Sequence, residues 1–248
     1  MQEQGCRGAG SGDQTEDAVL KAKAERRLSI TALICTLNEE ESLPHVLPRI
    51  PDWIDEVLLV DGHSTDNTVT LAKRLRPDVR TVHQPGTGKG DALKYGFEQA
   101  SGDIIVTLDA DGTTDPKDIP RFVEPLLHGY DFVKGSRFRR GLPADKPRHR
   151  IFGNWMIAMT FDLLFFRTYT DLCSGYNAFW KKHLDKVDLS GGQFEDEPLV
   201  NVRVRKAGLK VKEVGHIDRG RVGGESKAPS WRQGFGAIKT IVRERFRG

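Results

Sequence analysis

The strongest constraint on the fold is a series of short apolar runs that alternate with helical patterns. The runs are rich in β-branched residues and cover residues 28–35, 55–60, 79–82 and 103–108. An acidic helix start follows the first run, a helical stretch to residue 76 follows the second, and a helix over 91–99 follows the third. Strands and helices in this order form right-handed βαβ units. The sequence therefore predicts an α/β fold, with a mainly parallel central sheet flanked by helices.

Length and composition favour one folded domain between two short flanking segments. The chain has 248 residues, which suits a single α/β domain with a substantial core. Residues 1–27 are polar and lack the apolar segment of a secretion signal, so we expect a flexible N-terminal tail. The domain itself is expected over 28–228, and a basic amphipathic helix over 229–248. Cys6, Cys35 and Cys173 have no disulfide or metal-site spacing, which favours a reducing cytoplasm.

Two aspartates, Asp109 and Asp111, directly follow the fourth apolar run. Side chains in a strand repeat with a period of two, so the two carboxylates project from the same face. Such a pair suits a divalent ion, Mg2+ or Mn2+, which can hold a diphosphate at the same time. The other interpretation is a solvated turn, because Asp-x-Asp-Gly is also common in loops.

Other polar residues fall at the ends of the remaining runs, where ligands of parallel α/β sheets bind. They are Thr36, Asn38, Glu39, Asp61 and Lys89. The alternatives are structural, because Asn38 and the acids after it suit a helix N-terminus and Asp61 suits a turn. A further strand-like stretch leads into Arg137, which places that residue at the same rim. Its planar guanidinium can bind two phosphate oxygens.

The ordered motifs around these residues resemble those of a known family. The segments are TLNEEE at 36–41, VDGHSTDNT at 60–68, GTGKGDAL at 86–93 and LDADG at 108–112. As a set they resemble the family 2 inverting glycosyltransferases, whose fold is called GT-A. KGSRF at 134–138, DLCSGYNAF at 171–179 and RVGGESK at 221–227 look like the dolichyl- or polyprenyl-phosphate sugar synthase branch.

The resemblance implies a role for each motif. It implies a nucleotide-sugar donor, with GDP-mannose and UDP-glucose as the leading pairs, and a nucleotide pocket lined by Thr36, Asn38 and Glu39. Asp61 would contact the base and Lys89 the sugar diphosphate. The metal would lie on Asp109 and Asp111, so that Asp111 is also counted as catalytic.

Two acceptors remain open. A lipid phosphate is already anionic and needs cations beside it, which Arg219, Arg221 and Lys227 supply between flexible glycines. A hydroxyl acceptor needs a carboxylate base instead, because its pKa lies far above 7. Asp196 is the candidate base, although acids there also suit a helix N-terminus. We expect polyprenyl phosphate as the acceptor, with a hydroxyl of a small metabolite or glycan as the alternative.

Two segments combine apolar residues at helical spacing. Phe152, Trp155, Met156, Met159 and Leu163 define one stripe, and Trp231, Phe235, Ile238 and Val242 define another. The first segment is too short to span a bilayer, which takes roughly 20 residues. Residues 219–248 carry eight Lys or Arg and two Glu, a net of +6, whereas the whole chain is only +3. Each stripe either packs on the domain or contacts the membrane surface. We expect a cytoplasmic protein at the inner membrane face and no nucleic-acid partner, since no nucleic-acid module accompanies the charge.

Overall fold

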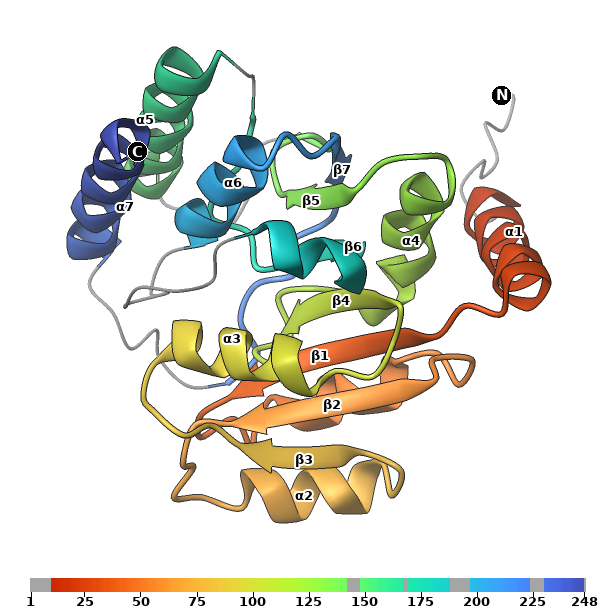
Figure 1. Ribbon diagram of the computed structural model, residues 1–248. Coiled ribbons are helices and arrows are strands. Elements are labelled where there is room, and N and C mark those ends of the chain that lie inside the picture. Colours follow the sequence, from red (N-terminus) through yellow and green to blue (C-terminus); the bar gives the residue numbers. More distant parts are fainter. Residues whose placement is uncertain (1–9, 142–147, 167–168, 188–196, 224–229, 248) are drawn as a thin grey trace, which may run out of the picture.

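The central sheet contains seven strands with helices on both faces (Figure 1). The computed structural model describes residues 10–141, 148–166, 169–187, 197–223 and 230–247. The strands are β1 (Ile30–Thr36), β2 (Glu56–Asp61), β3 (Arg80–His83), β4 (Ile104–Asp109), β5 (Phe132–Ser136), β6 (Asn177–Trp180) and β7 (Val211–Gly215), in the order β3-β2-β1-β4-β6-β5-β7. Only β6 runs antiparallel to its neighbours within this described sheet. The predicted fold class is confirmed.

Alternate residues of the central strands bury themselves in two separate core layers. In β1, Ala32 and Ile34 pack into the layer beneath α2 (Thr68–Leu75) and α4 (Ile119–Leu127). Leu33, between them, packs into the layer beneath α3 (Lys89–Gln99) and α6 (Glu197–Lys206). This is the period of two that a strand buried on both faces requires. The sheet is therefore fixed from both sides, and its strand ends are rigid supports.

Strands β1 to β4 end one residue later than the apolar runs indicated. Thr36, Asp61 and Asp109 are therefore the last residues of β1, β2 and β4 and are held within the sheet. The acidic helix start expected after β1 is wrong. Two short 3-10 helices, η1 (Leu43–His45) and η2 (Leu47–Arg49), follow instead, because Pro44 and Pro48 each remove a backbone donor that an α-helix needs.

Much of the segment expected as an N-terminal tail over residues 1–27 is helical. Residues Gly10–Arg26 form helix α1, which packs beside α4. Val19 is its buried anchor, Lys23 pairs with Asp55 at 2.9 Å, and Glu16 accepts a hydrogen bond from Trp53. Composition missed this helix because one apolar residue and a few polar contacts hold it. Residues 1–9 lie outside the described chain.

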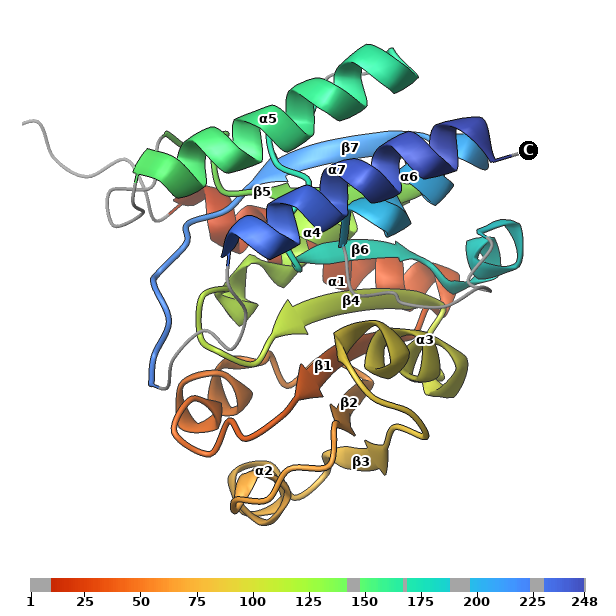
Figure 2. The same ribbon diagram turned by 90° about the vertical axis from the view of Figure 1, so that its left-hand side faces the viewer.

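Helices α5 (Arg148–Phe165) and α7 (Ser230–Phe246) form an outer layer beyond the sheet, on the α6 side (Figure 2). Their inner faces meet over a third core cluster, which includes Ile157 and Phe161 of α5 and Ala237 and Ile241 of α7. The helix expected at 229–248 is present as α7. It is packed against α5 and α6 and belongs to the folded body.

The apolar stripe predicted over residues 152–163 is not the face of α5 that packs against the rest of the protein. Phe152, Trp155, Met159 and Leu163 are all exposed, and Leu163 is 72% exposed. Met156, the remaining residue of the stripe, is half-buried, and the opposite face carries the buried residues. Of the two alternatives, packing on the domain is therefore not what the structure shows. On α7, Phe235 and Val242 are exposed as well, while Ile238 is only partly buried. None of the described helices is both long enough and apolar enough to cross a membrane.

Candidate active site

The carboxyl ends of β1, β2 and β4 meet at one edge of the sheet and bring the predicted residues together. Thr36 pairs in register with Asp61, and Cys35 with Asp109. A cavity of about 290 Å3 lies at this edge. Predicted residues that line it are Thr36, Glu39, Lys89, Asp109, Asp111 and Arg221. Chain segments nearly 200 residues apart therefore build one pocket.

Asp109 and Asp111 each meet a cation at the mouth of this cavity. Lys89 Nζ lies 2.7 Å from Asp109 Oδ1, and Arg221 lies 3.3 Å from Asp111 Oδ2. Burial alone would raise the pKa of Asp109, but the ammonium of Lys89 lowers it below its ordinary value. Burial and the neighbouring charge of Asp109 raise the pKa of Asp111. The raised pKa of Asp111 thus partly reflects repulsion between the two carboxylates, which a bound cation would reduce.

The donor set fits a divalent ion that shares its coordination with a ligand. Asp111 Oδ1 is held by Thr113, whose hydroxyl lies 2.6 Å away, so that Oδ2 faces the cavity side occupied by Arg221. No third His, Cys, Asp or Glu completes a metal cluster with them in the described ranges. Mg2+ is typically bound in this way, by one or two carboxylates together with water and substrate phosphates. Asp111 lies in the turn after β4, but both carboxylates are only 22% exposed and paired with cations, unlike those of a freely solvated turn.

Asp61 lies beneath the cavity and organises the loop after β2. Its buried carboxylate accepts hydrogen bonds from the Ser64 amide at 3.0 Å, the Ser64 hydroxyl at 2.5 Å and the Thr36 hydroxyl at 3.4 Å. His83 at the end of β3 lies 3.2 Å from the same carboxylate. In this structure Asp61 braces the pocket wall, and a contact to a base stays a prediction.

Asn38 and Glu39 lie in the turn after β1 and cap no α-helix. Asn38 has a φ of 53°, and its Oδ1 accepts a hydrogen bond from the Thr65 amide at 2.8 Å. The left-handed backbone suits an Asn. Glu39 accepts hydrogen bonds from Arg221 at 2.5 Å and from Ser42 at 2.9 Å. Glu39 therefore faces the cavity, whereas Asn38 ties the two neighbouring loops together.

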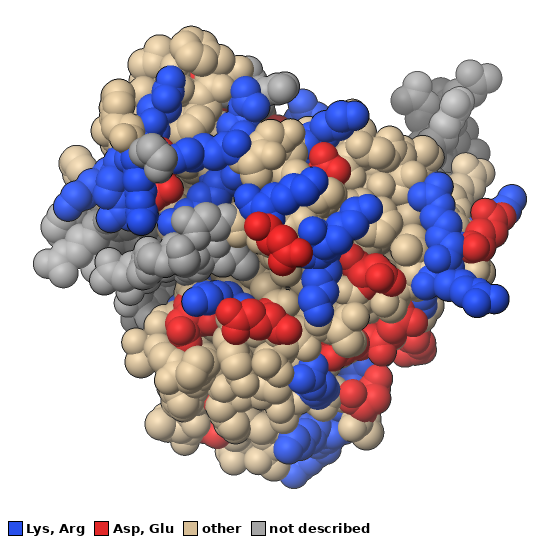
Figure 3. Space-filling view, in the orientation of Figure 1, with Lys and Arg blue, Asp and Glu red and all other residues tan. Residues whose placement is uncertain are grey.

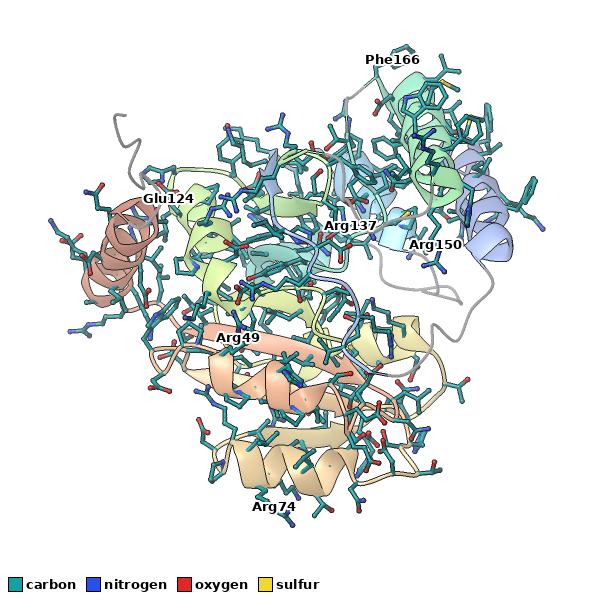
Figure 4. The ribbon with its side chains drawn as sticks, turned by 180° about the vertical axis from the view of Figure 1, so that it is seen from behind. Arg49, Arg74, Glu124, Arg137, Arg150 and Phe166 are labelled. Carbon is teal, nitrogen blue, oxygen red and sulfur yellow. The ribbon has the colours of Figure 1, made fainter. Side chains whose placement is uncertain are left out.

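Arg137 is paired with a buried carboxylate, that of Asp171. Its guanidinium makes two hydrogen bonds to Asp171, at 2.6 and 2.8 Å, and its backbone amide makes a third. Burial raises the pKa of Asp171, but the charge of Arg137 outweighs it and brings the pKa to about 2. Figure 4 labels Arg137 between the sheet and α5. The predicted phosphate contact is untested, and the observed partner is Asp171.

The loop after β7 lies across the end of β4. Val222 N donates to Asp111 O at 2.9 Å, and Arg219 N donates to Thr113 O at 3.2 Å. The side chain of Arg219 pairs with Asp115, and that of Arg221 bridges Glu39 and Asp111. Two of the predicted acceptor cations are thus placed beside the predicted metal site. The other predicted acceptor residue, Lys227, and the candidate base Asp196 lie outside the described residues.

Several pocket residues were not predicted. Leu37, Gly62, Gln84, Gly88 and Ala92 line the cavity as well. Gln84 is buried and donates to the Gly86 carbonyl at 3.1 Å. The signal for Gln84 was its place directly after β3, the same edge rule that found Asp61. Glycine and alanine leave no chemical signal of their own, because they serve the pocket by giving room.

This architecture defines an α/β protein with a paired-carboxylate site at the strand ends, and the comparisons give its family. The chain matches the profile described as Glycosyl transferase family 2 over residues 31–188. That stretch is more than half of the chain and includes the strand ends around the cavity. The chain belongs to glycosyltransferase family 2, as its motifs indicated.

Two curated relatives come from Haloferax volcanii. One, named Glycosyltransferase AglJ, is 34% identical over 191 residues, which cover 75% of this chain and 61% of the relative. The chain thus spans less than two thirds of that relative's length. The other, named Dolichyl-phosphate hexose transferase, is 29% identical over 217 residues, which cover 86% of this chain and 92% of the relative.

A solved structure shares the fold. Glucosyl-3-phosphoglycerate synthase from Mycobacterium tuberculosis, crystallised with Mn2+, UDP-glucose and phosphoglyceric acid, superposes with a TM-score of 0.73 at 23% identity. The superposition covers 92% of this chain and 82% of that one. It confirms the predicted GT-A fold.

Proposed function

We propose that this chain transfers a hexose, with inversion, from a nucleotide diphosphate sugar to a polyprenyl phosphate. The observation that carries the proposal is the cavity at the carboxyl ends of β1, β2 and β4. It combines Asp109, Asp111, Lys89 and Arg221 within one space. An anionic donor needs such cations, and a divalent ion needs such carboxylates.

Each of these residues has a task in that reaction. Asp109 and Asp111 would hold Mg2+ or Mn2+, which when bound supplies positive charge to the departing diphosphate. Lys89, 2.7 Å from Asp109, is placed to bind the same diphosphate once the carboxylates face the ion. Thr36 and Glu39 line the nucleotide end of the cavity. The donor is GDP-mannose or UDP-glucose, and the neighbour crystallised with UDP-glucose supports a donor of this class.

The acceptor side is supported by charge and by relatives. Arg219 and Arg221 lie in the loop that covers Asp111, so an acceptor phosphate bound by them would lie beside the proposed metal site. The relative named Dolichyl-phosphate hexose transferase covers nearly the whole chain. An anionic acceptor oxygen needs no strong base, so these cations suffice for the step.

The runner-up is transfer to a hydroxyl of a small metabolite or glycan, with Asp196 as the base. It is favoured by the structural neighbour crystallised with phosphoglyceric acid. Substitution Asp196→Asn separates the two, with Asp185→Asn, an exposed aspartate of η4 (Lys181–Lys186), as the control. Near-normal turnover of Asp196→Asn supports the phosphate acceptor. Loss of nearly all turnover supports the hydroxyl acceptor.

The first experiment identifies donor and acceptor together. Purified protein is incubated with Mn2+ and radiolabelled GDP-mannose or UDP-glucose, with a short polyprenyl phosphate or with phosphoglyceric acid. We expect label to enter the organic phase only with the polyprenyl phosphate. Label in a new water-soluble product would favour the runner-up. No consumption of either donor would contradict both and leave a non-catalytic nucleotide-binding role.

The outer faces of α5 and α7 support a peripheral membrane location for this reaction. Five large apolar side chains follow one line along and just beyond α5: Phe152, Trp155, Met159, Leu163 and Phe166. Figure 4 labels Arg150 and Phe166 at opposite ends of this helix. Such a narrow apolar face is the part of an interfacial helix that enters the lipid surface.

Basic residues surround that apolar face. Arg148 and Arg150 are exposed at the start of α5, and Lys239 and Arg243 are exposed on α7. Figure 3 shows Lys and Arg gathered over the α6 and α7 side of the molecule. The two acids on α5 and α7 are engaged, since Asp162 accepts the Tyr169 amide and Glu244 pairs with Arg247. Anionic lipid at the inner face of the cytoplasmic membrane matches this surface.

A further inference from the structure

Gly175 lies directly behind the carboxylate of Asp109. It belongs to the segment that leads into β6, which neighbours β4 in the sheet. A Cβ atom added to Gly175 would lie 2.5 Å from Asp109 Oδ1 and 2.6 Å from Oδ2. Both oxygens would clash at once, so turning the carboxylate about its own axis gives no relief. Any side chain at position 175 therefore displaces Asp109.

The Asp109 carboxylate also has a neighbour on its other side. Lys89 Nζ binds its Oδ1 at 2.7 Å from the cavity side. The carboxylate is therefore held between an ammonium and a backbone. The Gly175 side of this pair is a backbone wall, so the carboxylate is directed towards the cavity, as a metal ligand there requires.

The Gly175 backbone cannot retreat either. Its carbonyl accepts hydrogen bonds from the Thr107 hydroxyl at 2.7 Å and from Asn177 Nδ2 at 3.2 Å. Thr107 lies on β4 itself, two residues before Asp109. The same strand thus carries the aspartate and holds the backbone behind it.

The residue before Gly175 is fixed by two further side chains. The Ser174 carbonyl accepts a hydrogen bond from the fully buried Lys134, and the Ser174 hydroxyl lies 2.9 Å from His216 Nε2. His216 directly follows β7 and precedes the loop that carries Arg219 and Arg221. The segment behind Asp109 is therefore tied to β5 and to the acceptor loop.

We infer that Gly175 is a positioning residue for the metal site, because its backbone sets the direction of the Asp109 carboxylate. The inference rests on the proposed metal role of Asp109. Gly175 itself touches neither donor nor ion, and it acts through Asp109. A glycine that served the fold alone would affect stability without a specific effect on metal affinity.

The test measures Mn2+ binding by the electron paramagnetic resonance of free Mn2+, without substrates. Gly175→Ala is expected to lower Mn2+ affinity at least about tenfold, as loss of the groups that orient a metal ligand does. The matched control is Gly153→Ala in α5, where an added Cβ meets nothing within 4 Å. Wild-type affinity in Gly175→Ala would overturn the inference. If the wild type binds no Mn2+, the proposed metal site fails instead.

A second measurement keeps the inference testable if Gly175→Ala is unstable. The measurement is a double-mutant cycle read out by Tm in the absence of metal. The effect of Gly175→Ala on Tm is measured once in the wild type and once in the Asp109→Ala variant. The clash needs the carboxylate, so we expect the drop in Tm to be several degrees in the wild type and nearly absent in Asp109→Ala. An equal drop in both backgrounds would mean that Gly175 does not act through Asp109. Thr107→Val, which removes the hydrogen bond to the Gly175 carbonyl, should weaken Mn2+ binding in the same direction.

Discussion

The two sides of the cavity are built in different ways. On the donor side, Thr36, Asp61 and Asp109 are the last residues of three paired parallel strands, and the strand register sets their spacing. On the acceptor side, Arg219 and Arg221 lie in a loop with left-handed glycines at 220 and 223. That loop is held to the sheet by a few hydrogen bonds, such as Val222 to Asp111.

The difference shows which part of the reaction the fold itself determines. Backbone pairing fixes Asp109 at the end of β4, and Thr113 holds Asp111 in the turn that follows, as binding an ion and a diphosphate requires. The acceptor cations instead depend on ion pairs that a ligand can replace, since Arg221 bonds Glu39 and Asp111 and Arg219 bonds Asp115. A rigid donor side and an adaptable acceptor side are consistent with one fold serving different acceptors.

The largest expected effect comes from removing a donor-side carboxylate. Asp111→Asn keeps the size of the side chain but removes the charge beside Asp109. We expect turnover to fall by about a thousandfold or more, because loss of a group that stabilises the leaving charge costs this much. Initial rates at saturating Mn2+ measure it. A fall of less than tenfold would mean that the acceptor side, and not this aspartate, limits the reaction.

The buried Arg137–Asp171 pair should appear as a pH effect on stability. The pKa of Asp171 is about 2 in the folded state, below its ordinary value. Its contribution is therefore present above about pH 4 and is lost as the pH falls towards 2. It amounts to roughly 2 kcal/mol at neutral pH. The difference in unfolding free energy between wild type and Asp171→Asn should shrink over that interval, as measured by urea denaturation at several pH values.

Two matched substitutions should separate the sides by their Michaelis constants. Lys89→Ala is expected to raise the donor KM about tenfold, and Arg219→Ala the acceptor KM by a similar factor, since each removes one charged hydrogen bond. Each substitution should leave the other KM nearly unchanged. If Arg219→Ala raised only the donor KM, the loop would belong to the donor side and the comparison would break down.

The smallest expected effect concerns the outer face of α5. Leu163→Gln removes one exposed apolar side chain and should lower binding to vesicles of anionic phospholipid about fivefold, as loss of part of a leucine's transfer free energy implies. Thr70→Gln on α2, an exposed site distant from α5, serves as the control. Co-sedimentation measures the binding. Equal binding by both variants would argue against membrane contact through this face.

Local sequence patterns predicted strands β1 to β4. The side-chain partners of the site residues depend on contacts between distant parts of the chain, which such patterns do not show. Strand alternation predicted the parallel sheet and the edge at which Asp109 and Asp111 lie. It could not show that Asp171 would take the guanidinium of Arg137, 34 residues earlier, or that Arg221 would reach Glu39, 182 residues away. Such pairs depend on tertiary structure alone.

Two further features had weak sequence signals for physical reasons. Among the side chains of helix α1 that the structure describes, only Val19 is buried, too little to give an apolar period. The α5 helix is apolar on two faces, so periodicity could not say which face is buried. Exposure in the structure resolves that ambiguity in favour of Ile157 and Phe161.

The most direct test of the donor site is a Mn2+ titration followed by electron paramagnetic resonance, with and without GDP or UDP. The account predicts that wild-type protein binds one Mn2+, that one of the two nucleotides tightens this binding, and that Asp111→Ala abolishes both effects. Unchanged Mn2+ and nucleotide binding in Asp111→Ala would contradict it.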